Sequence, residues 1–300
     1  MSSKLPTEIQ TSTTNSTHKA EHSAKKRHMK DSASQVIAIA QAHSLDAMVS
    51  EEAPSKTLFE RAMLREKQRK EHRQKNLEQI IKATLDTCNK EVAGEPDFDW
   101  LTRYFEMAQE IHNSSMQKLW AQVLKREVTN PGSTSLKALK TLKDMTPKEA
   151  QTLQRAASLA CTFGTDSSRK LLLGVRHQAG FFSFSKRESV DELSLGEFQL
   201  PYSSLLLLME LGILLTTELE SGEIEVNSAL KLAYQGTEVA LHAKSKGITL
   251  TYYRFTPTGI ELCQLLGNRI NTHYQEKLID LLNRKFTVKG DVSGPIHHTV

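Results

Sequence analysis

Apolar residues recur at helical spacing along the middle of the chain. From Leu101 to Leu124 they return every three or four positions, which is the 3.6-residue period of an amphipathic helix. The stretch NPGS at 130–133 ends this pattern, because Pro131 cannot continue a helix and glycine accepts a positive φ. A new apolar stripe begins at Leu136. The pattern therefore predicts a helix, a tight loop and a second helix.

Several of the predicted helices begin at residues that suit the N-cap position. Ser, Thr and Asp side chains accept the free N–H groups of a first helical turn, and Pro in that turn needs no acceptor. In TPKE at 146–149, the glutamate also stands at the capping-box position. The candidate caps are Asp97 or Asp99, one of Ser133, Thr134 and Ser135, then Thr146 and Thr256.

A long helix is predicted over about 56–89, and its two halves differ. The first half is charged nearly all round and mainly basic, whereas the second half carries an apolar face. A polar helix of this kind is usually a solvated surface, and the alternative is a basic arm that contacts nucleic acid. The candidate contacts for that alternative are Arg65, Arg69, Lys70 and Arg73.

The composition changes after residue 164. The stretches FFSFS at 181–185 and ITLTYYRF at 248–255 have the aromatic and β-branched content of strands, and a helix is predicted between them at about 201–211. We therefore predict a mainly α fold, in which a helical domain precedes a smaller α+β domain. The predicted segments are a disordered tail at 1–33, the helical domain at 34–165, the α+β domain at 166–285 and a flexible tail at 286–300.

The amino-acid composition narrows the class and location of the protein but does not indicate a function. The 300 residues are 38% hydrophobic and 25% charged, with a net charge of +4, as in ordinary globular proteins. Three widely spaced cysteines fit a reducing compartment better than a disulfide framework. The N-terminus lacks the apolar core of a secretory signal, and the run LLLLMELGILL is too short to span a bilayer. We expect a cytoplasmic protein without a transmembrane segment.

Motifs for the common chemistries are absent from the sequence. It contains no GxxxxGK[ST] or GxGxxG loop for phosphates, no GxSxG nucleophile elbow, no HExxH and no CxxC pair. His18 and His22 are four residues apart but stand in the predicted tail. We therefore expect no catalytic, cofactor or metal site, and no bound cofactor.

Three carboxylates on the central helices are candidates for a dispersed catalytic site. Glu106 and Glu110 share a helix face, and a hydrolase or nuclease would require them to meet Glu127 in one cleft. Glu127 stands in the last turn of its helix, where the dipole disfavours an anion. We favour a structural role for Glu127, as a clasp across the loop that uses Lys137 or the free N–H groups of the next helix start.

The region from 97 to 142 resembles the signature of an uncharacterised bacterial family of conserved hypothetical proteins, a domain of unknown function. The pattern of that signature is QxLWAx[IV]LxxExxxPG[ST]xSx[RK]xL, preceded by a tryptophan. The matching residues are Trp100, Gln117, Leu119, Trp120, Ala121, Val123, Leu124, Glu127, Pro131, Gly132, Ser133, Ser135, Lys137 and Leu139. The resemblance implies a helical cytoplasmic protein and supplies no mechanism.

The chain departs from that signature at two positions. Asn113 stands where an acidic residue is expected, and Lys137 stands where arginine is expected. A lysine cannot make the forked contact to a carboxylate that arginine makes. A clasp between Lys137 and Glu127 would therefore be looser in this chain.

A second stretch resembles the C-terminal half of a winged helix, with a wing that is unusually long. The matching residues are Leu205, Leu208, Gly212, Ile213, Tyr253, Phe255, Thr256, Gly259 and Leu262. From Glu197 to Glu218 the chain has no Lys or Arg, so the element that would enter a DNA groove lacks the cations for phosphate contacts. A winged-helix-like module here would pack against protein.

These observations favour a non-enzymatic interaction or regulatory module that binds a protein partner or self-associates. The alternative is a nucleic-acid-associated regulator that uses the basic helix and the winged-helix-like region. An enzyme with the carboxylate site described above is the third candidate.

Overall fold

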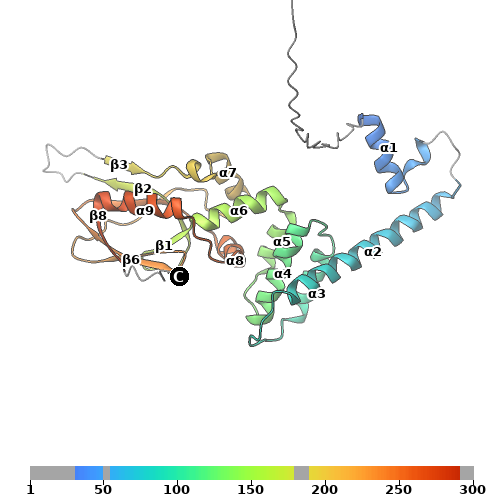
Figure 1. Ribbon diagram of the computed structural model, residues 1–300, viewed down its shortest axis with the longest axis horizontal. Coiled ribbons are helices and arrows are strands. Elements are labelled where there is room, and N and C mark those ends of the chain that lie inside the picture. Colours follow the sequence, from blue (N-terminus) through green and yellow to red (C-terminus); the bar gives the residue numbers. More distant parts are fainter. Residues whose placement is uncertain (1–30, 50–54, 179–188, 291–300) are drawn as a thin grey trace, which may run out of the picture. The chain divides into compact units, whose positions relative to one another are not determined.

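The computed structural model describes residues 31–49, 55–178 and 189–290 (Figure 1). The chain divides into two compact units, Met1–Lys67 and Gln68–Val300. Several sequence predictions fall outside the described residues. They are the tail up to residue 30, the FFSFS strand at 181–185, and the last ten residues.

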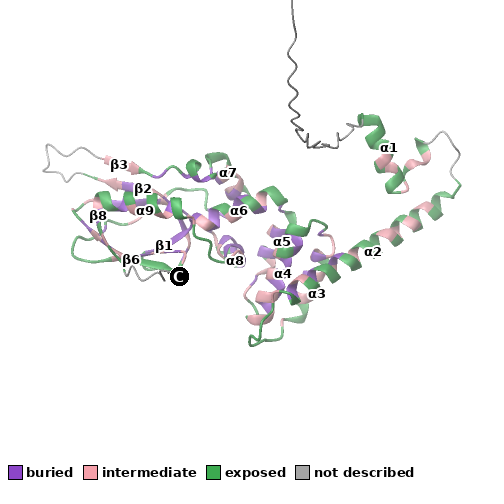
Figure 2. Cartoon of the chain, in the orientation of Figure 1, coloured by how far each residue is buried: buried purple, intermediate pink, exposed green. Residues whose placement is uncertain are grey.

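The described part of the N-terminal unit begins with a short helix. This helix, α1 (Ser32–Ala42), starts at Asp31, whose side chain accepts the Ser34 N–H. It buries none of its residues, and in Figure 2 it carries only the green and pink of exposed and intermediate positions. A 3₁₀ turn, η1 (Asp46–Met48), follows it.

The predicted long helix is present as α2 (Leu58–Leu85). At its start, the Thr57 and Glu60 side chains each accept the other's backbone N–H, which is the reciprocal arrangement of a capping box. Its buried residues all lie in the second half, where the sequence turns amphipathic: Asn76, Ile80 and Thr84.

The apolar stripe from Leu101 to Leu124 predicted one helix, but it runs along two successive helices. Asn113 interrupts it, because its side-chain oxygen accepts the N–H groups of Ser115 and Met116 and so starts a new helix. Two further helices follow, and the proposed capping box at Thr146 is present. The four helices are α3 (Phe98–Ala108), α4 (Ser114–Thr129), α5 (Leu136–Asp144) and α6 (Pro147–Leu159).

In the described part of the chain, an antiparallel eight-stranded sheet follows α6, so the prediction of a mainly α chain was wrong and the fold is mixed α+β. The strand order is β4-β7-β2-β1-β5-β6-β8, and β3 pairs with β2. The strands are β1 (Cys161–Phe163), β2 (Lys170–His177), β3 (Ser189–Glu192), β4 (Leu219–Glu220), β5 (Leu230–Tyr234), β6 (Thr237–Ala243), β7 (Ile248–Arg254) and β8 (Phe286–Gly290).

The last strand corrects the predicted C-terminal tail. Residues 286–290 were expected to be flexible, but β8 pairs with β6 from Phe286↔Ala243 to Gly290↔Val239. The alternating side chains of FTVKG place Phe286 in the core and Thr287 outside, as the two-residue period of a strand requires.

The helices of the C-terminal half are α7 (Tyr202–Glu210), α8 (Pro257–Leu265) and α9 (Thr272–Lys285), with a 3₁₀ turn, η2 (Leu195–Phe198). Thr256 caps α8 as predicted. The winged-helix arrangement is not confirmed. Strands β5 and β6 form a hairpin, but β7 pairs with β2 and β4 within the large sheet.

One continuous apolar core joins the helices and the sheet of the C-terminal unit. Helix α8 contacts α4, α5 and α6, so it brings the C-terminal half of the sequence onto the helical bundle. Gly259 lets the first turn of α8 lie close to the segment after α7, because a Cβ there would lie 2.2 Å from the carbonyl oxygen of Ile213. The core thus fixes the loop between α4 and α5 from both halves of the sequence.

Candidate functional site

The loop between α4 and α5 closes around the carboxylate of Glu127. Its oxygens accept the backbone N–H groups of Gly132 at 2.6 Å and Thr134 at 3.2 Å. Glu127 is 1% exposed, and a buried carboxylate needs such donors to offset the loss of water. Of the two partners considered from the sequence, the structure gives the loop amides, while Lys137 is exposed.

Two other contacts hold the same loop. The indole Nε1–H of Trp100 donates to the carbonyl oxygen of Thr134 at 2.7 Å. On the other side, the Gly94 N–H donates to the Val128 carbonyl, and a Cβ at Gly94 would lie 2.6 Å from the ring of Pro131. The loop residues Pro131 and Gly132 are therefore set by packing as well as by Glu127.

The start of α5 is capped twice. The Ser135 side chain accepts the Ala138 N–H, and the backbone N–H of Ser135 donates to a carboxylate oxygen of Glu261 in α8 at 2.8 Å. The second contact joins residues far apart in the sequence, so no local motif announces it. Each contact joins a backbone N–H to a side-chain oxygen, which is the arrangement of a structural joint.

Gln117 and Trp120 also make structural contacts. The Gln117 amide donates to the Ile111 carbonyl at 2.9 Å, across the break between α3 and α4. The ring of Trp120 is fully buried, and its backbone carbonyl accepts the hydroxyl of Tyr104 at 2.8 Å. Desolvation raises the pKa of Tyr104 well above the usual value, which keeps this hydroxyl a donor.

The three carboxylates of the candidate catalytic site have separate environments. Glu127 is enclosed by its loop, and Glu110 pairs with Arg73 of α2 at 2.5 Å. The Glu106 side chain shares neither set of contacts and is exposed. In the described parts of the chain, no group of three His, Cys, Asp or Glu residues could hold a metal ion.

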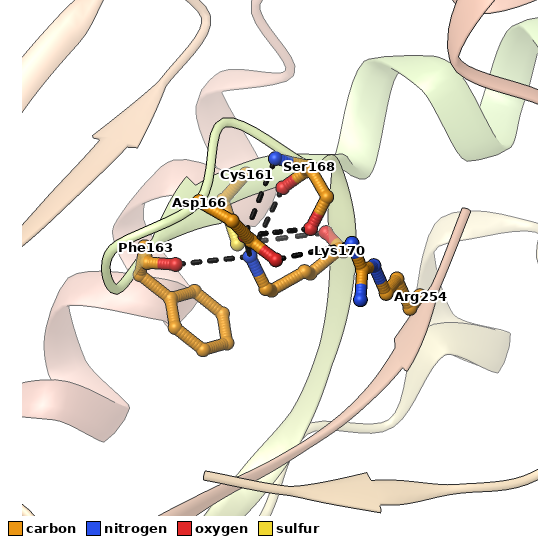
Figure 3. A network of polar contacts seen from close by, with 6 residues as sticks. All are labelled: Cys161, Phe163, Asp166, Ser168, Lys170 and Arg254. Carbon is orange, nitrogen blue, oxygen red and sulfur yellow. Dashed lines mark hydrogen bonds and ion pairs between the residues drawn. The ribbon is translucent and has the colours of Figure 1, made fainter. Parts of the chain in front are cut away.

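A buried lysine that sequence reasoning missed lies at the start of β2 (Figure 3). Lys170 is 3% exposed, and its Nζ donates to the carbonyl oxygens of Phe163 at 2.9 Å and Ser168 at 3.1 Å, and to the Asp166 carboxylate. Arg254 also pairs with Asp166, at 3.2 Å. These cations and the Ser168 hydroxyl lower the pKa of Asp166 to about 2, with the hydrogen bond from Lys170 the largest cause.

This network is a structural clasp in the loop before β2. An ammonium group has three N–H donors, and all three of Lys170 have protein acceptors. The Nζ also lies 4.9 Å from the ring centre of Phe163, within the range of a cation–π contact. A side chain so enclosed by protein acceptors leaves its Nζ no open approach for a substrate. Beside it, burial raises the pKa of the Cys161 thiol to about 12, so this sulfur stays protonated.

A family comparison places these elements in a wider context. Residues 60–279 match the family described as Protein of unknown function (DUF2806). The chain belongs to the DUF2806 family. No curated protein and no solved structure matches the chain. The DUF2806 match contains the Glu127 loop and the Lys170 clasp, whereas α1 and η1 precede it.

The candidate nucleic-acid contacts lie on α2, inside the DUF2806 match. Arg65, Arg69 and Lys70 are exposed, whereas Arg73 is occupied by its ion pair with Glu110. The charge of Arg73 is therefore partly compensated by the Glu110 carboxylate. None of the described helices is long and apolar enough to cross a membrane.

Apolar side chains concentrate on the surface of the N-terminal unit. Met48 is 96% exposed, and α1 and the start of α2 add further large apolar residues that are exposed. The exposed apolar residues there, which we call the N-terminal apolar surface, are Val36, Ile37, Ile39, Leu45, Met48, Val49, Leu58, Phe59 and Met63. We take these nine residues as a candidate interaction site, because exposed apolar patches mark such sites.

Two open cavities lie in the DUF2806 match. The first, of about 530 Å³, is bounded by α4, α6 and the segment after α8. The second, of about 640 Å³, adjoins the Lys170 clasp and is lined by the segment 221–231. Sequence reasoning identified neither of them, because each is lined by residues from separate elements.

Proposed function

We propose that this DUF2806 protein is a non-enzymatic interaction module of the cytoplasm, which docks a partner protein through the N-terminal apolar surface. The partner presents an apolar groove rimmed by carboxylates. The observation that carries this proposal is the exposure of nine large apolar side chains between Val36 and Met63. The sparse, unpaired cysteines support the reducing compartment.

The apolar part of the partner surface follows from α1 and η1. Helix α1 contains no charged residue and buries none of its side chains. Leaving such side chains in water costs roughly 1.5–3 kcal/mol each relative to full burial. A groove in a partner would recover that free energy, as in other complexes where an apolar helix face lies in a groove.

The acidic rim follows from the charge of α2 and the residue before its cap. From Lys56 to Lys75 the sequence has eight Lys or Arg residues and three Glu residues. Carboxylates around the groove would be attracted to this stretch and would set the orientation of docking. A second copy of the chain would bring like charges together, which makes a homodimer through this surface less favourable.

Nucleic acid is the second candidate partner, supported by exposed Arg65, Arg69 and Lys70. Phosphate contacts account for cations, but they give no role to exposed isoleucine, valine and methionine side chains. The apolar surface therefore favours a protein partner over a polyanion.

The test begins with a photo-crosslinking amino acid at Met48 in the full-length chain, expressed in its own cells. The cross-linked protein is identified, purified and titrated against variants of the full chain. Ile39→Asp should weaken binding about 30-fold, which corresponds to about 2 kcal/mol of lost apolar burial. Arg61→Gln and Arg65→Gln should weaken it less, and the effect should shrink at high salt.

The matched control is Leu206→Asp, since Leu206 is 47% exposed on α7 and lies outside the N-terminal apolar surface. Its affinity should equal that of the wild-type chain. Equal losses in Leu206→Asp and Ile39→Asp would contradict the proposal. So would a cross-link to nucleic acid, to lipid, or to a second copy of this chain in place of another protein.

A further inference from the structure

The cavity of about 530 Å³ in the C-terminal unit is lined by cations and by polar side chains that bond to no other residue that the structure describes. The proposed docking role does not use it. This cavity lies where α4 and α6 face the segment after α8, and we call it the α4–α6 cavity. Its volume falls within the roughly 300–1,000 Å³ of small-molecule pockets. It has an open side through which a ligand can enter from solvent.

Six polar side chains line this cavity. Within the described parts of the chain, none of the six makes a hydrogen bond or an ion pair through its side chain, whereas buried amides nearby, such as Asn76 and Gln117, are bonded. The six are Ser115, Lys118, Gln122, Gln151, Gln154 and Arg269.

The charge of the lining has one sign. Among the described residues that line the α4–α6 cavity, Lys118 and Arg269 are the only charged ones, and none is a carboxylate. The first turns of α4 and α6 also line the cavity, through Ser115 and Pro147, so the partial positive charges of these helix starts add to the two cations. The cavity by the Lys170 clasp differs, because Asp166, Glu223 and Glu225 line it together with lysines.

The remaining lining is apolar and suits a flat ring. Met116, Leu119, Ala150, Leu265 and Leu266 supply it. Glutamine side chains hydrogen-bond the donor and acceptor edge of a heterocyclic base, while Lys and Arg bind phosphate. The three glutamines and the two cations offer both kinds of contact around one apolar surface.

We propose that the α4–α6 cavity binds a mononucleotide, with its phosphate at Lys118 and Arg269 and its base against the apolar lining. Gln122, Gln151 and Gln154 bond the edge of the base. This assignment is independent of the docking surface, which lies in the other unit of the chain.

The test is isothermal titration of the purified full-length protein with AMP, GMP, CMP and UMP, each compared with its nucleoside and with inorganic phosphate at equal ionic strength. At least one nucleotide should bind at least 10-fold more tightly than its nucleoside and than phosphate. Lys118→Gln and Arg269→Gln should each weaken that binding about 10-fold or more. Both residues are exposed, so both variants should fold normally.

Two further variants separate base recognition from charge. Gln154→Leu should reduce the preference for one base over another while leaving the affinity for inorganic phosphate unchanged. Lys140→Gln removes an exposed lysine of α5 that does not line the cavity, and it should bind like the wild-type chain.

Several results would overturn the assignment. They are the absence of binding by all four nucleotides, equal affinity for nucleotide and inorganic phosphate, or equal losses in Lys140→Gln and Lys118→Gln. Binding of single-stranded RNA without any binding of mononucleotides would also overturn it. Because the titration contains no partner protein, its result is separate from that of the docking test.

Discussion

Replacing Glu127 by glutamine changes one oxygen of a buried carboxylate into an amide group and leaves its size almost unchanged. The carboxylate accepts two backbone N–H groups, from Gly132 and Thr134, but the amide offers only one acceptor oxygen. One N–H of the loop then loses its partner and faces another N–H donor.

The cost can be worked out from these two bonds. A hydrogen bond to a charged group contributes about 1.5–3 kcal/mol, and the surviving bond becomes a weaker neutral one. Against this, the variant avoids the cost of burying a charge. We therefore expect Glu127→Gln to lower the free energy of unfolding by about 2–3 kcal/mol, a large part of the roughly 5–15 kcal/mol typical of a folded protein.

The measurement is urea unfolding at pH 7, followed by tryptophan fluorescence. Trp100 contacts the loop directly and Trp120 lies in the preceding helix, so both report on this region. Glu106→Gln is the matched control, because that side chain is exposed on α3, and its effect should stay within about 0.5 kcal/mol. If Glu127→Gln also stays within that margin, the clasp does not stabilise the fold.

Two further predictions concern titratable groups. The folded-state pKa of Asp166 is lowered from 3.8 to about 2, so its contribution to stability is present above pH 4 and is lost as the pH falls toward 2. In denaturant titrations, the stability difference between the wild type and Asp166→Asn should shrink over that pH interval. A constant difference would refute the clasp. Cys88 is exposed, whereas Cys161 and Cys263 are buried with raised pKa values. A thiol reagent should therefore modify one cysteine per native chain and three after unfolding. Rapid modification of Cys161 in the native chain would contradict this.

Local signals in the sequence predicted helix starts well. Thr146 and Thr256 cap helices as expected, because a cap depends on residues within one turn. The break between α3 and α4 was missed for a related reason. Ile111 and Met116 are both buried on either side of Asn113, so the apolar stripe continues across a gap in the helix.

Contacts between distant residues were beyond the sequence. Strand β8 pairs with β6, and β7 pairs with β2, although the paired residues lie far apart in the sequence. No local sequence pattern indicates which strands will pair. Without these pairings the balance of helix and sheet could not be judged, and the mainly α prediction failed.

The candidate sites divide in the same way. The partner of Glu127 lies within seven residues, so the sequence already indicated a clasp across that loop. The α4–α6 cavity takes its lining from α4, α6 and the segment after α8, and each glutamine or lysine in isolation looks like an ordinary solvated residue. Only the fold brings them together.

The contact between Ser135 and Glu261 also bears on how the chain is made. Glu261 follows Ser135 by 126 residues, and α8 covers surfaces of α4, α5 and α6. A ribosome releases the helical bundle first, before the strands and the helix that complete it. The nascent bundle must therefore hold its unfinished apolar faces in water, or against a chaperone, until α8 emerges, and the last third of translation decides when the first helices become native.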